Sequence, residues 1–271
     1  MAHISYSTVS VKDKVLWTPV YHSILDILGS TGTIIPLGDT TSENAGRTTC
    51  TTRGDQQVVF TYSEAVTSFD TAPGNAGPGK IPVILFNDVD EEADTPDIAY
   101  WTRGNAAVDS AFSVGCWIKI TNLGENQRII SKWGAVAREW MFWVNSGNLT
   151  RLDLWDESVD KTPFRPANTA LTAATWAFIV ATYDGGGGAT AANGINLYTN
   201  GALDNGAATN DALYVAMEDL TAPVEIAMLS TSVDFDAALA GGPLGIFFVQ
   251  AELSADAIIR LYQIGREMLG V

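Results

Sequence analysis

The chain has 271 residues, of which 46% are hydrophobic and 10% aromatic, and its formal net charge is −16 at pH 7. This composition is typical of a globular protein and excludes an intrinsically disordered one. The acidic excess argues against nucleic acid and anionic membranes as partners, because both would repel the protein.

Rare residue types exclude further classes. Two cysteines and two histidines, with no Cys-x-x-Cys pair, argue against a zinc site. Cys116 is interpreted as a small buried hydrophobe. The sequence has no G-x-S-x-G motif, which argues against a Ser-His-Asp catalytic triad. No basic start followed by an apolar run and no apolar stretch of membrane-spanning length is found, so we expect a chain made in the cytoplasm without secretory export.

The first 79 residues differ from the rest in their pattern of predicted elements. HISYSTVSV (3–11) alternates like a strand, and VLWTPVYHSILDILG (15–29) predicts a short helix after Pro19 that ends at Gly29. QQVVFTYSEAV (56–66) predicts another strand. The Pro/Gly-rich stretch TAPGNAGPGK (71–80) is the best domain boundary. We therefore predict an attachment region at 1–79 and a second domain at 80–271.

Strand signals become regular after this boundary. Short apolar runs bounded by turn residues are typical of an all-β sandwich or jelly roll. The C-terminal segment predicts a helix, with Ser254 as its N-cap and an apolar stripe before Gly265. The predicted strands are IPVILF, AFSVGCWIKI, QRIISKW, WMFWVN, LTRLDLWDE, TWAFIVATY, INLYTNG, VEIAML and LGIFFVQAEL.

The stretch TWAFIVATYDGGGGATAANGINLYTNG (175–201) predicts a hairpin. Both faces of its first strand are apolar, which indicates a central strand covered on both sides. The four glycines precede another strand and no lysine, so they form a hairpin connection and not a phosphate loop. Asn200-Gly201 supplies the positive φ angles of a tight turn.

Several of these motifs together resemble the laminin-G-like domains with the concanavalin-A-like jelly roll. In that family a Trp-led strand ends in Tyr-Asp-Gly and the next strand ends in Tyr-x-Asn-Gly, as WAFIVATYDG and INLYTNG do here. FSVGCWIKI, IISKW and LGIFFVQAELSADAIIRLYQIGR match neighbouring family strands and the closing helix. The resemblance covers about residues 81–266 and implies an all-β jelly-roll sandwich. The fold hosts lectins, hydrolases and adhesion modules alike.

Two acidic loops predict a Ca²⁺ site. Closely spaced carboxylates suit a hard cation with six to eight oxygen ligands, and a jelly roll brings distant loops together. The alternative is a solvated acidic surface. Family members often carry an acidic residue after the glycine of the closing strand, where this chain has Ile246. The candidate ligands are Asp88, Asp90, Asp94, Asp234 and Asp236.

Aromatic and acidic residues on neighbouring strands predict a carbohydrate site, with Trp133, Trp140, Trp155 and Asp153 as candidates. The alternative for most of these rings is core packing, since Trp140 and Phe142 share one face of WMFWVN and Met141 and Trp143 the other. Asp153 and Glu157 share a strand face, but the Glu-x-Asp-x-x-Glu pattern of jelly-roll glucanases is absent, so we expect no enzyme.

We expect a virion structural protein, a phage capsid decoration or head/tail fibre component made in the host cytoplasm and displayed on the particle. Residues 1–79 would dock on a capsid or tail protein through rings such as Trp17, Tyr21 and Phe60. The jelly roll would stabilise the shell or contact surface glycans, in an assembly expected to be a trimer by analogy. The alternatives are an extracellular lectin module and a glycoside hydrolase.

Overall fold

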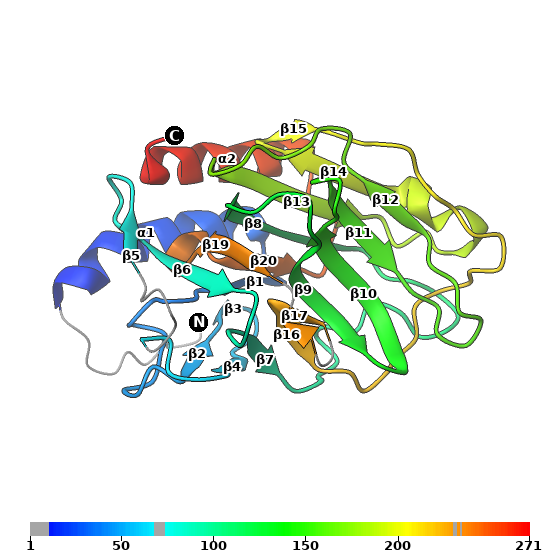
Figure 1. The fold of residues 1–271 in the computed structure, drawn as a ribbon, viewed down its shortest axis with the longest axis horizontal. Helices are drawn as coiled ribbons and strands as arrows, with labels where there is room; N and C mark the ends of the chain where they lie inside the picture. The colour runs from blue at the N-terminus through cyan, green and yellow to red at the C-terminus, as the bar shows by residue number, and fades with distance from the viewer. Residues whose placement is uncertain (1–10, 68–73, 230–231, 234) are drawn as a thin grey trace.

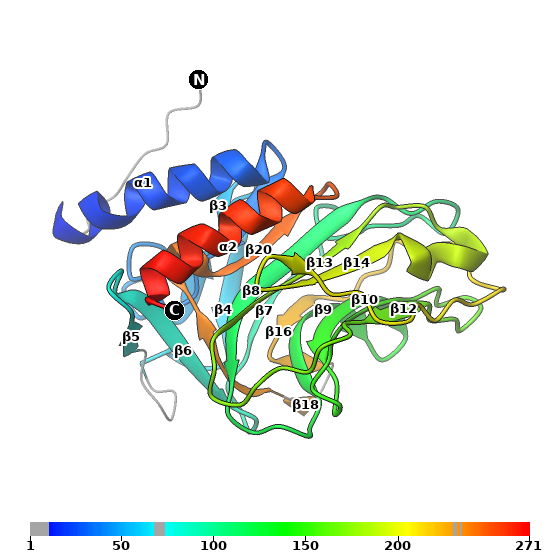
Figure 2. The same ribbon diagram turned by 90° about the horizontal axis from the view of Figure 1, so that it is seen from above.

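The computed structural model describes residues 11–67, 74–229, 232–233 and 235–271. Two large sheets pack face to face, and two helices lie against the outer side of one of them (Figures 1 and 2). The predicted all-β sandwich with a C-terminal helix is confirmed. The helices are α1 (Val11–Leu28) and α2 (Ala255–Leu269).

The larger sheet has ten strands. Its main path runs β15-β14-β13-β8-β19-β6-β5, with β20 paired to β8, β1 paired to β20 and β3 paired to β1. All of these pairings are antiparallel. The strands are β1 (Gly32–Ile35), β3 (Arg53–Gly54), β5 (Gly74–Ala76), β6 (Ile81–Asn87), β8 (Phe112–Ile120), β13 (Ala177–Tyr183), β14 (Ile195–Thr199), β15 (Ala202–Leu203), β19 (Asp236–Ala240) and β20 (Ile246–Val249).

The second sheet has eight strands in the order β12-β11-β10-β9-β16-β7-β4-β2. A small third sheet pairs β17 (Met228–Leu229) with β18 (Ser232–Val233), and η1 (Gly188–Gly194) and η2 (Gly242–Leu244) are short 3₁₀ turns. The eight strands are β2 (Thr49–Thr51), β4 (Val59–Tyr62), β7 (Ala93–Thr95), β9 (Gln127–Gly134), β10 (Ala137–Val144), β11 (Thr150–Leu154), β12 (Phe164–Pro166) and β16 (Val224–Ile226).

Strand β13 explains why the molecule has two cores. All seven of its residues are buried. Ile179 and Ala181 face the core between the sheets, whereas Phe178 and Val180 face the core beneath the helices. Because neighbouring residues of a strand point to opposite faces, a strand apolar on both sides must be covered on both. The predicted central strand and its hairpin partner β14 are confirmed.

Helix α2 packs closely on the ten-stranded sheet because it has a glycine at the contact. A Cβ built on Gly265 would lie 2.1 Å from Nε1 of Trp117 in β8. The Trp117 ring stacks on Tyr262 of the same helix, with 5.6 Å between ring centroids. The N-cap predicted at Ser254 is confirmed, since its side chain accepts a hydrogen bond from the amide of Ala257. The helix continues past the predicted apolar stripe to Leu269, and Gly265 serves packing inside it.

Helix α1 also begins earlier than expected. It contains Pro19, whereas the sequence predicted a start after this proline. Gly29 follows the helix with a φ of 79° and ends it as predicted. Most of the strand predicted at 3–11 lies outside the described residues, and Val11 is the first helical one. In the described part of the chain, no helix is both long and apolar enough to cross a membrane.

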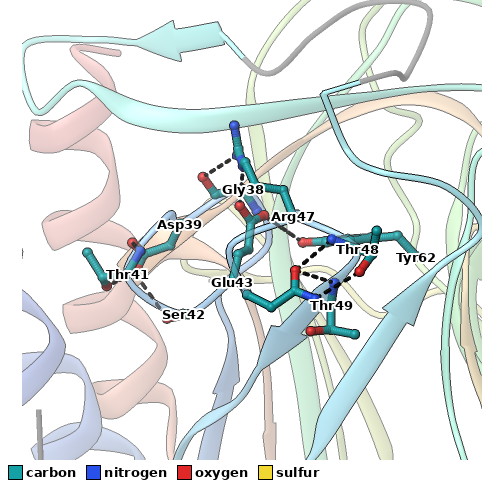
Figure 3. A network of polar contacts seen from close by, with 10 residues as sticks. Gly38, Asp39, Thr41, Ser42, Glu43, Arg47, Thr48, Thr49 and Tyr62 are labelled. Atoms are coloured by element: carbon teal, nitrogen blue, oxygen red, sulfur yellow. Dashed lines mark hydrogen bonds and ion pairs between the residues drawn. The ribbon is translucent and has the colours of Figure 1, made fainter. Parts of the chain in front are cut away.

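Residues before position 80 build both sheets. β1 pairs with β20 and β3 in the larger sheet, and β4 pairs with β7 in the smaller one. The boundary predicted at 79/80 therefore does not separate two sets of strands. Polar contacts join the loops of this region. Tyr62 donates its hydroxyl hydrogen to Glu43, and Glu43 also forms an ion pair with Arg47 (Figure 3).

Two of the rings predicted for docking are buried inside the protein. Phe60 has no exposed surface and lies in the core between the sheets. Tyr21 is 5% exposed and donates its hydroxyl hydrogen to Asp39, 2.6 Å away. Their docking role is corrected, because each ring already packs against its own chain. The side chain of Trp17 lies outside the described part.

Candidate functional site

Strand alternation decides which side chains reach the outer face of the eight-stranded sheet. In β10, Phe142 belongs to the core between the sheets, so its neighbours Met141 and Trp143 point outward. Arg151 and Asp153 of β11 lie directly across from Trp143 and Met141 and share this side. Both α-helices of the described chain lie against the other sheet, so within the described residues neither α1 nor α2 covers this outer face (Figure 2).

The first group on the outer face is centred on Trp143. Its indole lies between two guanidinium groups, with Arg128 at 4.4 Å and Arg151 at 5.0 Å from the ring centroid. The indole N–H donates to Oδ1 of Asp153 at 3.0 Å. Arg151 also donates to both carboxylate oxygens of Asp153, at 2.5 and 2.7 Å. We call these four residues the Trp143 group.

A second group of the same kind contains Trp155. Arg138 lies 4.0 Å from the Trp155 ring centroid and donates to both oxygens of Glu157, at 2.6 and 2.8 Å. Trp133, directly across from Arg138 on β9, meets Trp155 edge to face at 4.9 Å between centroids. These four residues, all half-buried, form the Trp155 group.

The structure thus places three of the four predicted carbohydrate residues on one face: Trp133, Trp155 and Asp153. The prediction for Trp140 is wrong. Its ring is fully buried between the sheets, stacks on Phe248 and donates its N–H to the carbonyl of Trp101. Trp140 and Phe142 occupy the inner side of β10, because that side has to fill the core.

Sequence reasoning missed the arginines and Trp143 as members of this face. Alternation in WMFWVN had separated Trp143 from Trp140, but it left open which pair points inward. Arg128 and Arg151 come from strands on either side of β10. The two arginines reach the Trp143 ring because of the register in which β9, β10 and β11 pair. No local sequence pattern encodes that register.

The two carboxylates differ in their electrostatics. Burial raises the pKa of Asp153 above its usual value, and the neighbouring Arg151 opposes this effect. Hydrogen bonds from Arg138 hold the pKa of Glu157 below its usual value. Each carboxylate binds a guanidinium group, Asp153 that of Arg151 and Glu157 that of Arg138. The carboxylates therefore orient the arginine side chains, and neither is a free acid.

The acidic loops meet only in part. Asn87 and Asp236 are direct partners between β6 and β19, and the amide of Asp88 donates to the carbonyl of Phe235 at 3.0 Å. Asp88 and Asp236 therefore lie at the same end of the ten-stranded sheet, as the sequence predicted for the two loops.

The other predicted calcium ligands do not complete a site there. Asp90 also lies at this end, where its carboxylate accepts a hydrogen bond from Asn87, but Asp94 belongs to β7 of the other sheet, opposite Glu225. Asp234 lies outside the described residues. Among the residues that are described, no three His, Cys, Asp or Glu side chains are grouped so that they could hold a metal ion.

Comparison of the sequence with protein families gives one result. The family model described as Concanavalin A-like lectin/glucanases superfamily matches residues 93–240, which is more than half of the chain. The matched segment contains every residue of the Trp143 and Trp155 groups. No curated protein sequence matches the chain.

Several solved structures are similar in fold. The binding domain of Paraclostridial Mosquitocidal Protein 1 aligns with a TM-score of 0.58 and 12% identity over 88% of this chain and 52% of that one. The binding domain of botulinum neurotoxin DC in complex with SialylT gives 0.54 and 15% over 88% and 52%. The same domain in complex with rat synaptotagmin II gives 0.55 and 13% over 89% and 52%. The chain spans about half the length of these structures, and identities this low show the fold alone.

Proposed function

Because this chain belongs to the concanavalin A-like lectin/glucanases superfamily, we propose that it is a non-catalytic carbohydrate-binding protein that contacts a glycan through the outer face of its eight-stranded sheet. The observation that carries the proposal is the clustering of the Trp143 and Trp155 groups on one sheet surface without helix cover. Sugar sites combine aromatic rings with a few oriented polar groups, and both groups have this composition.

The similar structures give this proposal limited support. The botulinum neurotoxin DC binding domain has been solved in complex with SialylT and with a synaptotagmin, so that fold serves recognition in those proteins. The family also includes glucanases, which makes a hydrolase the chemical alternative.

Non-catalytic function is proposed because the candidate acids are already bound. Glycoside hydrolysis needs one carboxylic acid that donates a proton and a second, free carboxylate. Here Arg138 binds Glu157 and lowers its pKa, and Arg151 binds both oxygens of Asp153. A hydrolase would show turnover of the bound glycan, lost in both Asp153→Ala and Glu157→Ala. Such turnover would contradict this part of the proposal.

Binding is tested on a glycan array with purified protein, in calcium and again in chelator. We expect saturable binding, and at least a tenfold loss of affinity in Trp155→Ala. Trp176→Ala is the matched control, because Trp176 is also a half-buried indole with a cation above it, Lys119 at 5.5 Å, but packs in the core beneath the helices. An array without any saturable signal would overturn the proposal. Loss of binding in chelator would assign a metal to the acidic loops.

We further propose that the protein is displayed on a virion, as a decoration or fibre component attached to a capsid or tail protein. The opposite placement of helices and outer face supports this, since one side could attach while the other contacts glycans (Figure 2). An antibody against this chain should label purified particles in electron micrographs, and unlabelled particles would contradict the proposal. Light scattering of the purified protein tests the expected trimer.

A further inference from the structure

Lys132 is a buried amine in contact with two carboxylates. It belongs to β9 and has no exposed surface. Its Nζ atom contacts Oε1 of Glu139 and donates a hydrogen bond to the carbonyl of Leu220. Nζ also lies 3.0 Å from Oδ1 of Asp97. These three contacts hold the amine in one place, next to two acids that come from different parts of the chain.

The contact with Asp97 brings the amine close to a carboxyl carbon. Cγ of Asp97 is bonded to Oδ1, so Nζ is at most one C–O bond farther from Cγ than from this oxygen. The two groups form an ion pair, but Oδ1 has no hydrogen-bond partner among the described residues. An amine held this close to a carboxyl carbon reacts far faster than the two groups would in free solution. The Asp97 side chain is 28% exposed, which leaves a small product a path to solvent.

Glu139 is suited to move protons between these two groups. Its side chain is fully buried, and burial raises its pKa from 4.5 to about 7, with Lys132 opposing the effect. Near neutral pH both protonation states of Glu139 are therefore populated, which is the condition for a general acid and base. Oε1 contacts Nζ of Lys132, and Oε2 has no hydrogen-bond partner within the described part of the chain.

We propose that Lys132 and Asp97 join in an intramolecular amide bond, with Glu139 as the residue that transfers the protons. The ammonium group of Lys132 passes one proton by way of Glu139 to a carboxylate oxygen of Asp97 and becomes a neutral amine. The nitrogen lone pair forms the Nζ–Cγ bond, and a second proton moves by way of Glu139 to the same oxygen. The C–O bond then breaks with its electron pair on oxygen, which leaves as water. The reaction needs no oxidant, reductant or co-reactant.

Burial favours the amide over the ion pair. Two charges removed from water cost free energy that their mutual attraction repays only in part, whereas an amide is neutral. The bond would also close the chain between Asp97 and Lys132 into a loop and tie the segment after β7 to β9. A cross-link stabilises a protein mainly by restricting its unfolded chain. This inference does not depend on the proposed carbohydrate binding.

Mass spectrometry of the full chain tests the proposal, after purification and again after prolonged incubation at neutral pH. We expect a mass lower by one water molecule than the mass calculated from the sequence. Trypsin does not cleave after an acylated lysine, so a digest should contain one branched product made of residues 81–103 and 129–138. A folded protein of full calculated mass that trypsin cleaves after Lys132 would overturn the proposal.

Two variants assign the reacting groups. Asp97→Ala removes the carboxyl carbon, and Glu139→Gln cannot transfer protons, so each should keep the full mass calculated from its sequence. Asp211→Ala is the matched control and should still lose one water molecule. Asp211 is also a partly exposed aspartate paired with a lysine, Lys161 at 3.9 Å, and its side chain is 30% exposed. Circular dichroism checks the fold of each variant.

The remaining outcomes are equally clear. Loss of water in Asp97→Ala would place the dehydration elsewhere in the chain and overturn the proposal. A branched product formed in full by Glu139→Gln would overturn the role assigned to Glu139. Where a variant does not fold, the mass and the digest of the unchanged protein decide, because they need no substitution.

Discussion

Lys132 shows what a single buried charge requires. It has no exposed surface and lies on the inner side of β9, across from Trp140. Its ammonium group contacts Glu139, Asp97 at 3.0 Å and the carbonyl of Leu220. A buried charge costs free energy unless it has partners. This network therefore holds the loops that contain Asp97 and Leu220 against Lys132.

Glu139 makes the stability of the protein depend on pH. Burial raises the pKa of Glu139 from 4.5 to about 7, and Lys132 only partly opposes this. Between these values the folded chain keeps a proton that the unfolded chain releases, so the free energy of unfolding falls as pH rises. We expect Glu139→Gln, which cannot titrate, to flatten this slope.

Urea unfolding at pH 5 and pH 7 measures the difference. Glu125→Gln, which changes an exposed carboxylate, serves as the control and should keep the slope of the unchanged protein. An equal slope in Glu139→Gln would show that other groups produce the pH dependence.

At the scale of the elements, the contact between α2 and β8 depends on shape. Glycine inside a helix costs about 1 kcal/mol relative to alanine. Gly265 is retained at the point where the helix meets Trp117, and the Trp117 ring stacks on Tyr262 and contacts Phe178 at a tilt. The close approach lets the helix cover the aromatic surface of the sheet.

Gly265→Ala should therefore destabilise the protein by about 2 kcal/mol, despite the better helix propensity of alanine, because the added methyl group overlaps Trp117. The free energy of unfolding from a denaturant titration measures this. Gln263→Ala, an exposed change two residues earlier in α2, should stay within about 0.5 kcal/mol. A stabilised Gly265→Ala would mean that the helix can shift outward without loss.

At the scale of the whole molecule, the protein is three layers: two helices, a ten-stranded sheet and an eight-stranded sheet. The chain before residue 80 contributes to every layer, through α1, β1 and β4. The attachment role predicted for residues 1–79 stays a prediction, and this region is also part of the fold.

Removal of residues 1–79 should abolish cooperative folding. It exposes the edge of β20 that pairs with β1, and it removes Phe60 from the main core. We expect an insoluble product or one without a thermal transition in circular dichroism. Removal of residues 1–10 alone, which leaves every described contact in place, is the comparison. A soluble, cooperatively melting fragment of 80–271 would show that the first 79 residues are dispensable for folding.

The sequence by itself determined the features that depend on neighbours along the chain. Alternation in 176–183 predicted a strand buried on both sides, and Asn200 and Gly201 have the predicted positive φ angles of 52° and 80°. Ser254 caps its helix as expected. The ordered motifs predicted the family, which the family model confirms.

Only the tertiary structure decided which side of β10 faces the core, and hence that Trp140 is buried while Trp143 reaches the outer face. It also brought Arg128 and Arg151 to one ring and joined β1 to β20. The alternation of side chains along a strand separates its residues into two faces, but only packing decides which face is buried. The pairing of strands far apart in the chain depends on packing that no local stretch encodes.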